Sequence, residues 1–173
     1  MDNSKKVVPL RLIVDGIEMA NDFSLDFLDT EEMAIVSLPA DGNYSITPET
    51  PQLAEDIEDD MEGRYIRLPT QWDIDEYRIM VKFVRSLDDE KQFEKLSRAI
   101  QGRGAFRRFK DTIWDLGLRD EWFAFEHEAY EKLARDWCRD HGLAFDPPAE
   151  DDDDEFEDED EFEDEFEDEN EDE

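Results

Sequence analysis

A run of basic residues interrupts an otherwise acidic chain. Between positions 95 and 110 there are six basic residues and no acidic residue, so this segment carries a formal charge of +6. Gly102 and Gly104 lie within it, just before an expected helix, where free backbone N–H groups and forked guanidinium donors can bind an anion together. The basic residues are Lys95, Arg98, Arg103, Arg107, Arg108 and Lys110. We predict an anion-binding site formed by Arg98, Arg103, Arg107, Arg108 and Lys110.

The same arginines could instead have a purely internal role. Asp111, Asp115, Glu90 and the acidic residues between 55 and 62 offer many carboxylate partners. Such pairs would hold helices together and leave no cationic surface, although an exposed pair is worth only about 0–1 kcal/mol. The segment also lacks the Lys-Ser/Thr pair of a phosphate-binding P-loop, so the sequence does not predict nucleotide binding.

The C-terminal segment repeats one acidic and aromatic pattern. Residues 150–173 contain 20 Asp and Glu and no basic residue, and the string Glu-Phe-Glu-Asp-Glu occurs three times around Phe156, Phe162 and Phe166. Repulsion among the carboxylates opposes compaction, so we expect a disordered tail. The three phenylalanines would bind a basic protein partner, attracted by the surrounding charge. The alternatives are a solubilising segment without a partner and an acidic inhibitor that imitates nucleic acid.

Few residues in the chain suggest catalysis. Cys138 and His141 have helical i, i+3 spacing, but two ligands do not make a zinc site, and we expect them to be buried or to lie at a helix end. No nucleophile elbow, His-Glu-x-x-His pair or dinucleotide-binding loop is present. Carboxylate pairs are uninformative among 53 acidic residues. The sequence therefore does not favour an enzyme and predicts no metal and no cofactor.

The overall charge limits the classes of partner. The 173 residues have a formal net charge of −34, of which residues 1–149 account for −14. This excludes a generally basic nucleic-acid-binding protein, because affinity for nucleic acid comes largely from neutralising phosphates. The chain has one cysteine, no apolar run long enough to span a bilayer and no apolar signal segment at its start. We expect a cytoplasmic protein without a membrane association, and we predict no oligomeric state.

Periodicity predicts helices and strands in a definite order. Leu10, Ile13, Val14 and Ile17 have the spacing of a helix over residues 9–20, whereas residues 23–27 and 34–38 alternate as in a β-hairpin. A short extended segment follows at 65–68. Helical spacing then continues to Gly142, with interruptions near 86–88, at Gly102 and Gly104, and at Gly117.

These elements predict an α+β fold with an N-terminal helix and β-hairpin, a helical C-terminal half and a disordered acidic tail. Residues 1–149 would form a single domain, and 150–173 the tail. Within the domain, residues 40–63 contain prolines, glycines and an acidic cluster, and we expect them to form a mobile acidic connection.

One segment carries a resemblance to a known family. Residues 102–111, Gly-Arg-Gly-Ala-Phe-Arg-Arg-Phe-Lys-Asp, are followed by Trp122-Phe123-Ala124-Phe125 and by a helix ending in Trp137. With Arg64-Tyr65-Ile66-Arg67-Leu68-Pro69, these residues resemble an uncharacterised bacterial protein family over about residues 9–145. The resemblance implies a small cytoplasmic bacterial protein and brings no catalytic residue with it.

The leading hypothesis is a non-enzymatic binding or regulatory protein. Partners would bind through the basic segment and the Phe-spaced tail, and the tail would fold back on the basic segment and inhibit it. The main alternative is an RNA- or DNA-binding protein in which the helix of the Gly-Arg-Gly-Ala-Phe-Arg-Arg-Phe-Lys string, residues 102–110, contacts phosphates and Phe or Trp side chains stack on bases.

Overall fold

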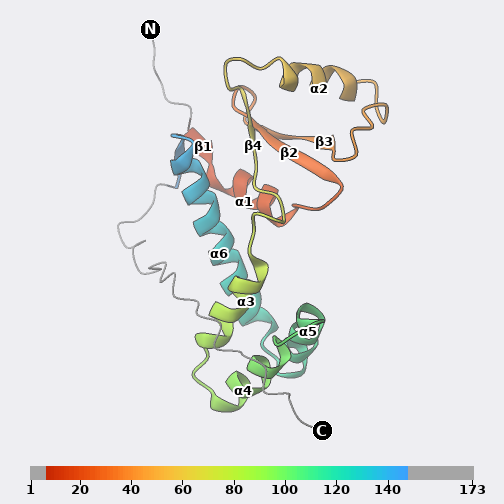
Figure 1. The fold of residues 1–173 in the computed structure, drawn as a ribbon. Helices are drawn as coiled ribbons and strands as arrows, with labels where there is room; N and C mark the ends of the chain where they lie inside the picture. The colour runs from red at the N-terminus through yellow and green to blue at the C-terminus, as the bar shows by residue number, and fades with distance from the viewer. Residues whose placement is uncertain (1–6, 148–173) are drawn as a thin grey trace.

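The computed structural model describes residues 7–147, and the predicted acidic tail with Phe156, Phe162 and Phe166 lies outside them. The α+β class is confirmed (Figure 1). The elements in chain order are β1 (Val7–Pro9), α1 (Leu10–Glu18), β2 (Ser24–Asp29), β3 (Ala34–Pro39), α2 (Thr50–Glu58), β4 (Tyr65–Arg67), α3 (Glu76–Arg85), α4 (Glu90–Ala99), α5 (Ala105–Asp115), α6 (Arg119–Asp140) and β5 (Ala144–Asp146).

The predicted hairpin is the centre of a three-stranded sheet. β2 pairs antiparallel with β3, and Phe27 lies opposite Val36. The extended segment predicted at 65–68 becomes β4, which pairs with the other edge of β2, so that the strand order is β3-β2-β4. The register places Asp29 of β2 opposite Tyr65 of β4. This pairing brings together residues that are 36 positions apart in the chain.

The predicted N-terminal helix is also confirmed and packs against this sheet. Leu10, Ile13, Val14 and Ile17 of α1 are all buried, as their spacing indicates. Gly16 is buried on the same side, and a β-carbon at this position would collide with the Leu68 side chain. The glycine therefore lets the helix approach the end of β4 closely, where a larger residue would push it away.

Two short strands that the sequence analysis did not predict join the two ends of the described part of the chain. β1 and β5 pair in parallel, with Val8 opposite Phe145. Each strand has only three residues, too few for the alternating pattern to be recognised. The pairing fixes the chain after α6 beside the start of α1.

Residues 40–63 contain more structure than the mobile connection expected from their composition. Thr50–Glu58 form helix α2, with Pro51 in its first turn, and Ala54 is buried. Leu53 and Ile57 are partly buried on the same helix. The surrounding acidic residues make this short apolar pattern hard to recognise in the sequence. In the structure, α2 covers the hairpin at one end of the molecule (Figure 1). Whether this segment is mobile remains a prediction.

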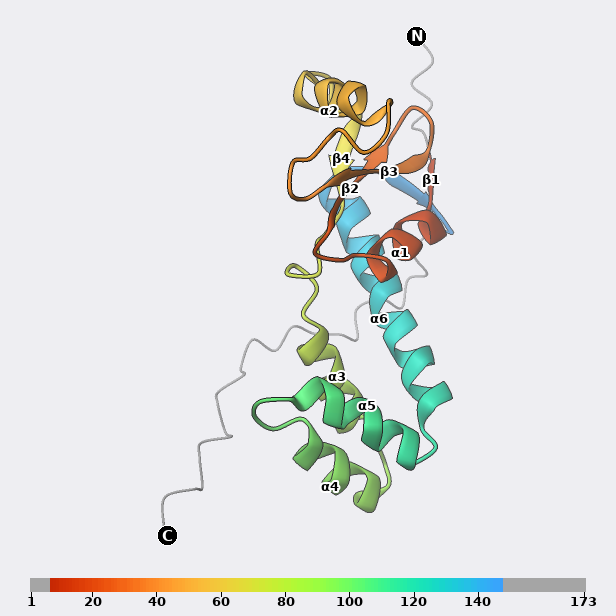
Figure 2. The same ribbon diagram turned by 90° about the vertical axis from the view of Figure 1, so that its right-hand side faces the viewer.

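Helix α6 is the longest element and connects both parts of the molecule. It runs beside α1 and the sheet at its C-terminal end and beside α3 and α5 at its N-terminal end (Figures 1 and 2). Phe83, Phe109 and Trp122 make edge-to-face contacts in the helical part, with Phe109 and Trp122 centroids 4.7 Å apart. Contiguous buried residues extend from Val8 to Cys138. Within residues 7–147, no helix has the length and apolar character needed to cross a membrane.

Candidate functional site

The basic segment predicted from the sequence forms the connection between α4 and α5. Arg98 lies in the last turn of α4, Arg103 in the connecting loop, and Arg107, Arg108 and Lys110 on α5. All five side chains are exposed, as is Lys95. The loop contains two glycines with positive φ, Gly102 at 68° and Gly104 at 81°, which permit the tight reversal between the helices. The structure therefore brings four of the predicted residues to the end of the helix pair at the loop, and Lys110 lies at the middle of α5.

Arg108 differs from the other basic residues because its guanidinium faces the protein backbone. Its Nε donates to the Ala99 carbonyl oxygen at 3.2 Å, and one Nη donates to the Arg103 carbonyl at 2.6 Å. The other Nη donates to the Gln101 carbonyl. Three donors of one side chain thus bind carbonyl groups at the end of α4 and in the loop, groups that have no partners within a helix. Arg108 holds the loop and is not a free anion ligand.

Arg98, Arg103 and Arg107 remain open to solvent. No carboxylate between residues 7 and 147 lies within ion-pair distance of these three guanidinium groups. The internal pairs considered above, with Asp111, Asp115, Glu90 or the 55–62 cluster, are therefore absent from the described structure. Lys110 makes a long contact with Glu76, at 3.9 Å between Nζ and Oε1, and both side chains are substantially exposed.

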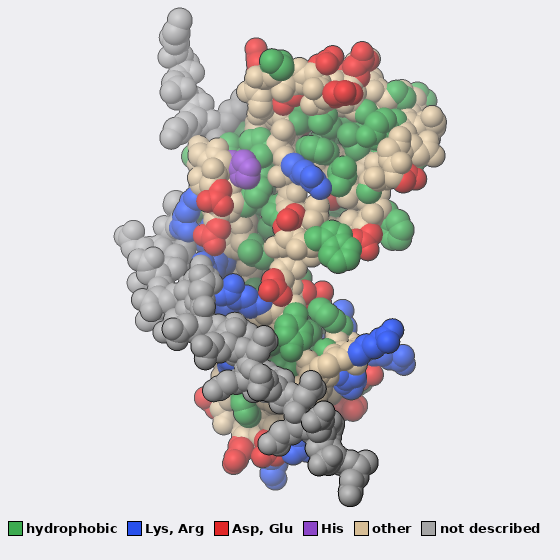
Figure 3. All heavy atoms as spheres, in the orientation of Figure 1, with side chains coloured by type: hydrophobic (Ala, Val, Ile, Leu, Met, Phe, Trp, Pro, Cys, Tyr) green, Lys and Arg blue, Asp and Glu red, His purple; other side chains and the backbone are tan. Residues whose placement is uncertain are grey.

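A stripe on α5 combines cationic and aromatic side chains. Arg107, Lys110 and Trp114 follow one another at i, i+3 and i+7, so they lie on one side of the helix, and Trp114 is 68% exposed. The buried side of α5 carries Phe109 and Ile113 instead. Basic side chains gather beside α5 at the lower right of the molecule in Figure 3. The helix is therefore buried on one side and cationic on the other.

The stripe ends in a small aromatic cluster at the corner between α5 and α6. The Arg119 guanidinium carbon lies 5.3 Å from the ring centroid of Trp114 and 5.3 Å from that of Phe123. Phe123 is 49% exposed. Among the described residues, Arg119 has no carboxylate partner. A cation close to two exposed rings offers both charge and apolar area to a ligand.

The comparison with protein families decides where this chain belongs. The model of the Uncharacterised protein family (UPF0158) matches residues 6–165. The chain is a member of this family. The resemblance noted from residues 102–111 and 64–69 is thereby confirmed at the level of the family. The match extends beyond the described residues into the acidic tail.

A bacterial relative has the same family name. The UPF0158 protein PA5073 of Pseudomonas aeruginosa is 26% identical over 66 residues, which cover 38% of this chain and 43% of the relative. The aligned region thus spans less than half of the relative's length. No solved structure matches the chain. Membership in UPF0158 brings no named activity, so the side chains themselves must carry any functional argument.

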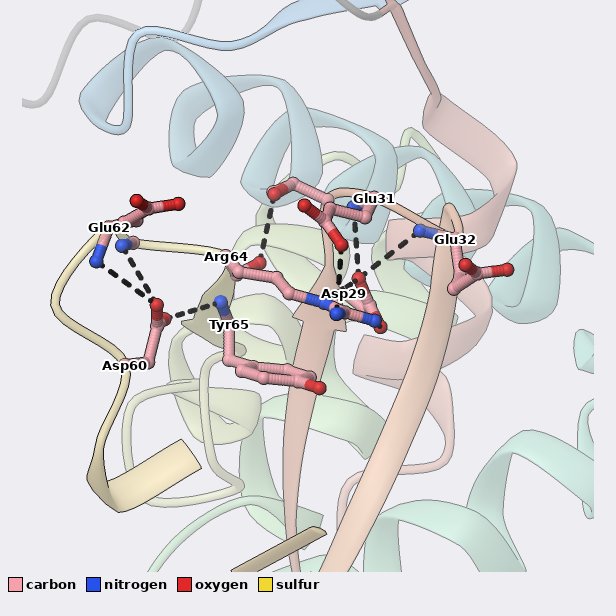
Figure 4. A network of polar contacts seen from close by, with 9 residues as sticks. Asp29, Glu31, Glu32, Asp60, Glu62, Arg64 and Tyr65 are labelled. Carbon is pink, nitrogen blue, oxygen red and sulfur yellow. Dashed lines mark hydrogen bonds and ion pairs between the residues drawn. The ribbon is translucent and has the colours of Figure 1, made fainter. Parts of the chain in front are cut away.

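A polar network in this UPF0158 protein was not predicted from the sequence (Figure 4). Asp29, at the end of β2, is only 3% exposed, and Arg64 donates to both of its oxygens, at 2.9 and 2.6 Å. Backbone N–H groups of Glu31 and Glu32 also donate to Asp29. The hydrogen bond and charge of Arg64 hold the pKa of the Asp29 carboxyl below its usual value, and pairing with Asp29 raises the pKa of Arg64. The network fastens the hairpin turn to β4.

Asp60 makes a second connection to the start of β4. Its carboxylate accepts hydrogen bonds from the backbone N–H groups of Glu62, Gly63 and Tyr65, the last at 2.8 Å (Figure 4). These donors, that of Tyr65 above all, keep the pKa of Asp60 below its usual value. The residue belongs to the acidic 55–62 cluster, so one member of that cluster has a local structural role. Its signal in the sequence was the Asp-x-x-Gly pattern of a turn.

Glu126 lies in an open depression between the end of α1 and the middle of α6. The depression has a volume of about 630 Å³ and is lined by Glu18, Phe123, Ala124, Glu126, His127 and Tyr130. Burial and the nearby charges of Glu76 and Glu18 raise the pKa of Glu126, and burial raises that of Tyr130. His127 Nδ1 lies 2.9 Å from Glu18 Oε1, which ties α6 to α1. The sequence analysis did not identify this site.

The residues with metal-ligand chemistry are placed apart. Cys138 is fully buried, and burial raises the pKa of its thiol to about 11. His141 follows the last residue of α6, where its Nδ1 lies 2.8 Å from the Trp137 carbonyl oxygen. These positions match the expected burial and helix-end roles. In the part of the chain that the structure describes, no group of three His, Cys, Asp or Glu side chains could hold a metal ion.

Proposed function

We propose that this protein is a non-enzymatic binding or regulatory protein. Its anionic partner binds to the α4–α5 surface, which is formed by Arg98, Arg103, Arg107 and Lys110. The observation that carries the proposal is the exposure of Arg98, Arg103 and Arg107 without any carboxylate partner among the described residues. Residues 1–149, which we call the body, have a net charge of −14 and therefore contain enough carboxylates to neutralise these arginines. The three side chains nevertheless pair with none of the described carboxylates. Unpaired guanidinium groups beside a helix start attract carboxylate or phosphate oxygens.

Arg108 gives this surface a defined shape. Because its guanidinium binds three backbone carbonyls, the loop that carries Arg103 is held between α4 and α5. A ligand that meets a preformed loop does not have to order it, and less of the binding free energy is lost. The five predicted anion-binding residues thus divide into three free cations, one weakly paired lysine and one arginine that positions the loop.

The acidic tail completes the proposal in two ways. It competes with external anions for the α4–α5 surface, and it attracts a basic protein partner, whose binding removes this competition. The tail is joined to the body, so it acts at an effective concentration in the millimolar range. We place this activity in the cytoplasm.

Binding of a fluorescent polyglutamate peptide tests the proposal. We expect a chain ending at residue 149 to bind more tightly than the full chain, with affinity falling steeply as salt rises. Replacing Arg103 and Arg107 with Ala should weaken binding at least 10-fold. Arg11→Ala is the matched control, since Arg11 is exposed on the distant helix α1. Equal binding by the double variant and the control would reject the α4–α5 surface.

Trp114 supports a second candidate, an RNA- or DNA-binding protein. The exposed indole lies on the same side of α5 as Arg107 and Lys110, so phosphates and a stacked base could be bound together. A single-stranded oligonucleotide should then bind at least 10-fold more tightly than polyglutamate of equal charge. Replacing Trp114 with Ala should remove most of this preference, since stacking on one base is worth about 1–3 kcal/mol.

A further inference from the structure

We propose that the cluster of Trp114, Arg119 and Phe123 is the docking site for Phe162 and Phe166 of the chain's own acidic tail. The inference rests on the function proposed above, because it names the segment that competes for the cationic surface. It also separates the three tail phenylalanines, which the sequence alone treats as equivalent.

The chemistry of the cluster fits a phenylalanine surrounded by carboxylates. Trp114 and Phe123 offer exposed rings, and an added aromatic ring is attracted to them by edge-to-face contact. The Arg119 guanidinium carbon lies 5.3 Å from each ring centroid, and the side chain pairs with no carboxylate of residues 7–147, so it can pair with one from the tail. The string Glu-Phe-Glu-Asp-Glu supplies both groups at once.

The cationic stripe on α5 extends the docking site. Lys110 and Arg107 continue from Trp114 toward the loop that carries Arg103. An acidic segment anchored at Trp114 can therefore extend along three cations of one surface. Residues 1–94 and 111–149 together carry a net charge of −20, and Asp115, Asp120 and Glu121 are close to the cluster in the chain. The attraction for the tail therefore comes from Arg119 and from the cations of the stripe.

Chain length decides which phenylalanines reach the cluster. β5, which leads to Pro147, lies beside the C-terminal end of α6, whereas α5 lies beside its N-terminal end (Figures 1 and 2). Helix α6 has 22 residues and is about 33 Å long. The fully extended chain from Pro147 spans at most about 32 Å to Phe156, about 54 Å to Phe162 and about 68 Å to Phe166.

Only the two later phenylalanines therefore reach the cluster with chain to spare. Phe156 would need a straight, fully extended path along the whole of α6, which costs conformational entropy and allows no detour around side chains. Phe162 and Phe166 can reach Trp114 without full extension, so the chain between Pro147 and these residues can still adopt many conformations. Phe156 thus provides a matched control with the same neighbours in sequence.

The test compares two variants of the full chain, Phe162→Ala/Phe166→Ala and Phe156→Ala. These changes lie in the tail and leave the core residues in place. The first readout is the NMR signal of the Trp114 indole N–H, assigned with Trp114→Phe. We expect this signal to shift in the double variant, while in Phe156→Ala it should stay at its position in the unmodified chain.

The second readout is the affinity for the fluorescent polyglutamate peptide at low salt. Loss of Phe162 and Phe166 should raise the affinity for the peptide about 3- to 10-fold in the double variant. The reason is that the tail, which competes at a millimolar effective concentration, then binds the surface less tightly. Phe156→Ala should change it less than twofold. An unmoved Trp114 signal, or equal effects of the two variants, would overturn the docking site. Loss of binding in Arg103→Ala/Arg107→Ala would in that case still uphold the proposed function.

Discussion

Arg108 Nε donates a hydrogen bond to the carbonyl oxygen of Ala99 at 3.2 Å, joining the interior of α5 to the end of α4. Arg107, the preceding residue, points to solvent and has no carboxylate partner among residues 7–147. Two adjacent arginines in one basic segment thus have opposite roles, one holding the loop and the other available to a ligand.

Replacing Arg108 with Ala should therefore destabilise the fold, whereas Arg107→Ala should not. We expect the free energy of unfolding to fall by about 1–2 kcal/mol in Arg108→Ala, because the carbonyls of Ala99, Gln101 and Arg103 lose a charged donor. Arg107→Ala should stay within about 0.5 kcal/mol of the unmodified protein. Urea denaturation measures both. Equal stability of the two variants would contradict the role of Arg108.

The Asp29–Arg64 pair predicts a larger effect on stability. Replacing Asp29 with Ala removes the acceptor for both Arg64 donors and for two backbone N–H groups. We expect a loss of about 1–3 kcal/mol, because the buried backbone N–H groups lose their acceptor, while Arg64 is partly exposed and still pairs with Glu31 at 2.8 Å. Thermal and urea unfolding of Asp29→Ala and of the exposed control Asp88→Ala would measure it. A loss below that of the control would show that the pair does not fasten β2 to β4.

The Asp29 carboxylate should also make the free energy of unfolding depend on pH. Because the folded-state pKa of Asp29 is lowered, its contribution is complete above the unfolded value of about 3.9 and is lost as the pH falls through the folded-state pKa. The stability difference between the unmodified protein and Asp29→Asn should therefore be greatest near neutral pH and shrink below about pH 4. Urea midpoints measured at several pH values would show this. A difference independent of pH would contradict it.

Glu126 should have the opposite dependence. Its folded-state pKa is raised by burial and by Glu76, so the ionised carboxylate destabilises the fold at neutral pH, and this cost disappears as the pH falls toward the unfolded pKa. Glu126→Gln should raise the melting temperature at pH 7 and have a smaller effect near pH 4. Glu128→Gln, an exposed position on the same helix, is the control and should change little.

Cys138 provides a probe of folding, because it is the only cysteine in the chain. Its pKa of about 11, raised by burial, leaves about 100-fold less thiolate at pH 8 than the ordinary value of 9 would. We expect a disulfide reagent to react with the native protein at least 100-fold more slowly than with the protein in concentrated urea. Similar rates in the two conditions would show that the end of α6 opens readily.

The elements that the sequence predicted correctly have signals within one short segment. The helical spacing of Leu10, Ile13 and Ile17 and the alternation in β2 and β3 predicted their elements, because each pattern lies within one segment. Helix α2 was missed since its short apolar side is embedded in acidic residues. β1 and β5 were missed because three residues carry no periodicity.

The sequence by itself determined the charge segregation, the order of the main elements, the family resemblance and the position of the basic segment, because these depend on residue type and short-range spacing. Only the tertiary structure decided which cations are free. Arg108 binds carbonyls at the end of α4 and in the following loop, and Arg64 binds the buried Asp29 of β2. Arg98, Arg103 and Arg107 pair with no carboxylate of residues 7–147. A charged side chain reaches partners brought near by folding, and such contacts leave no periodic trace in the chain.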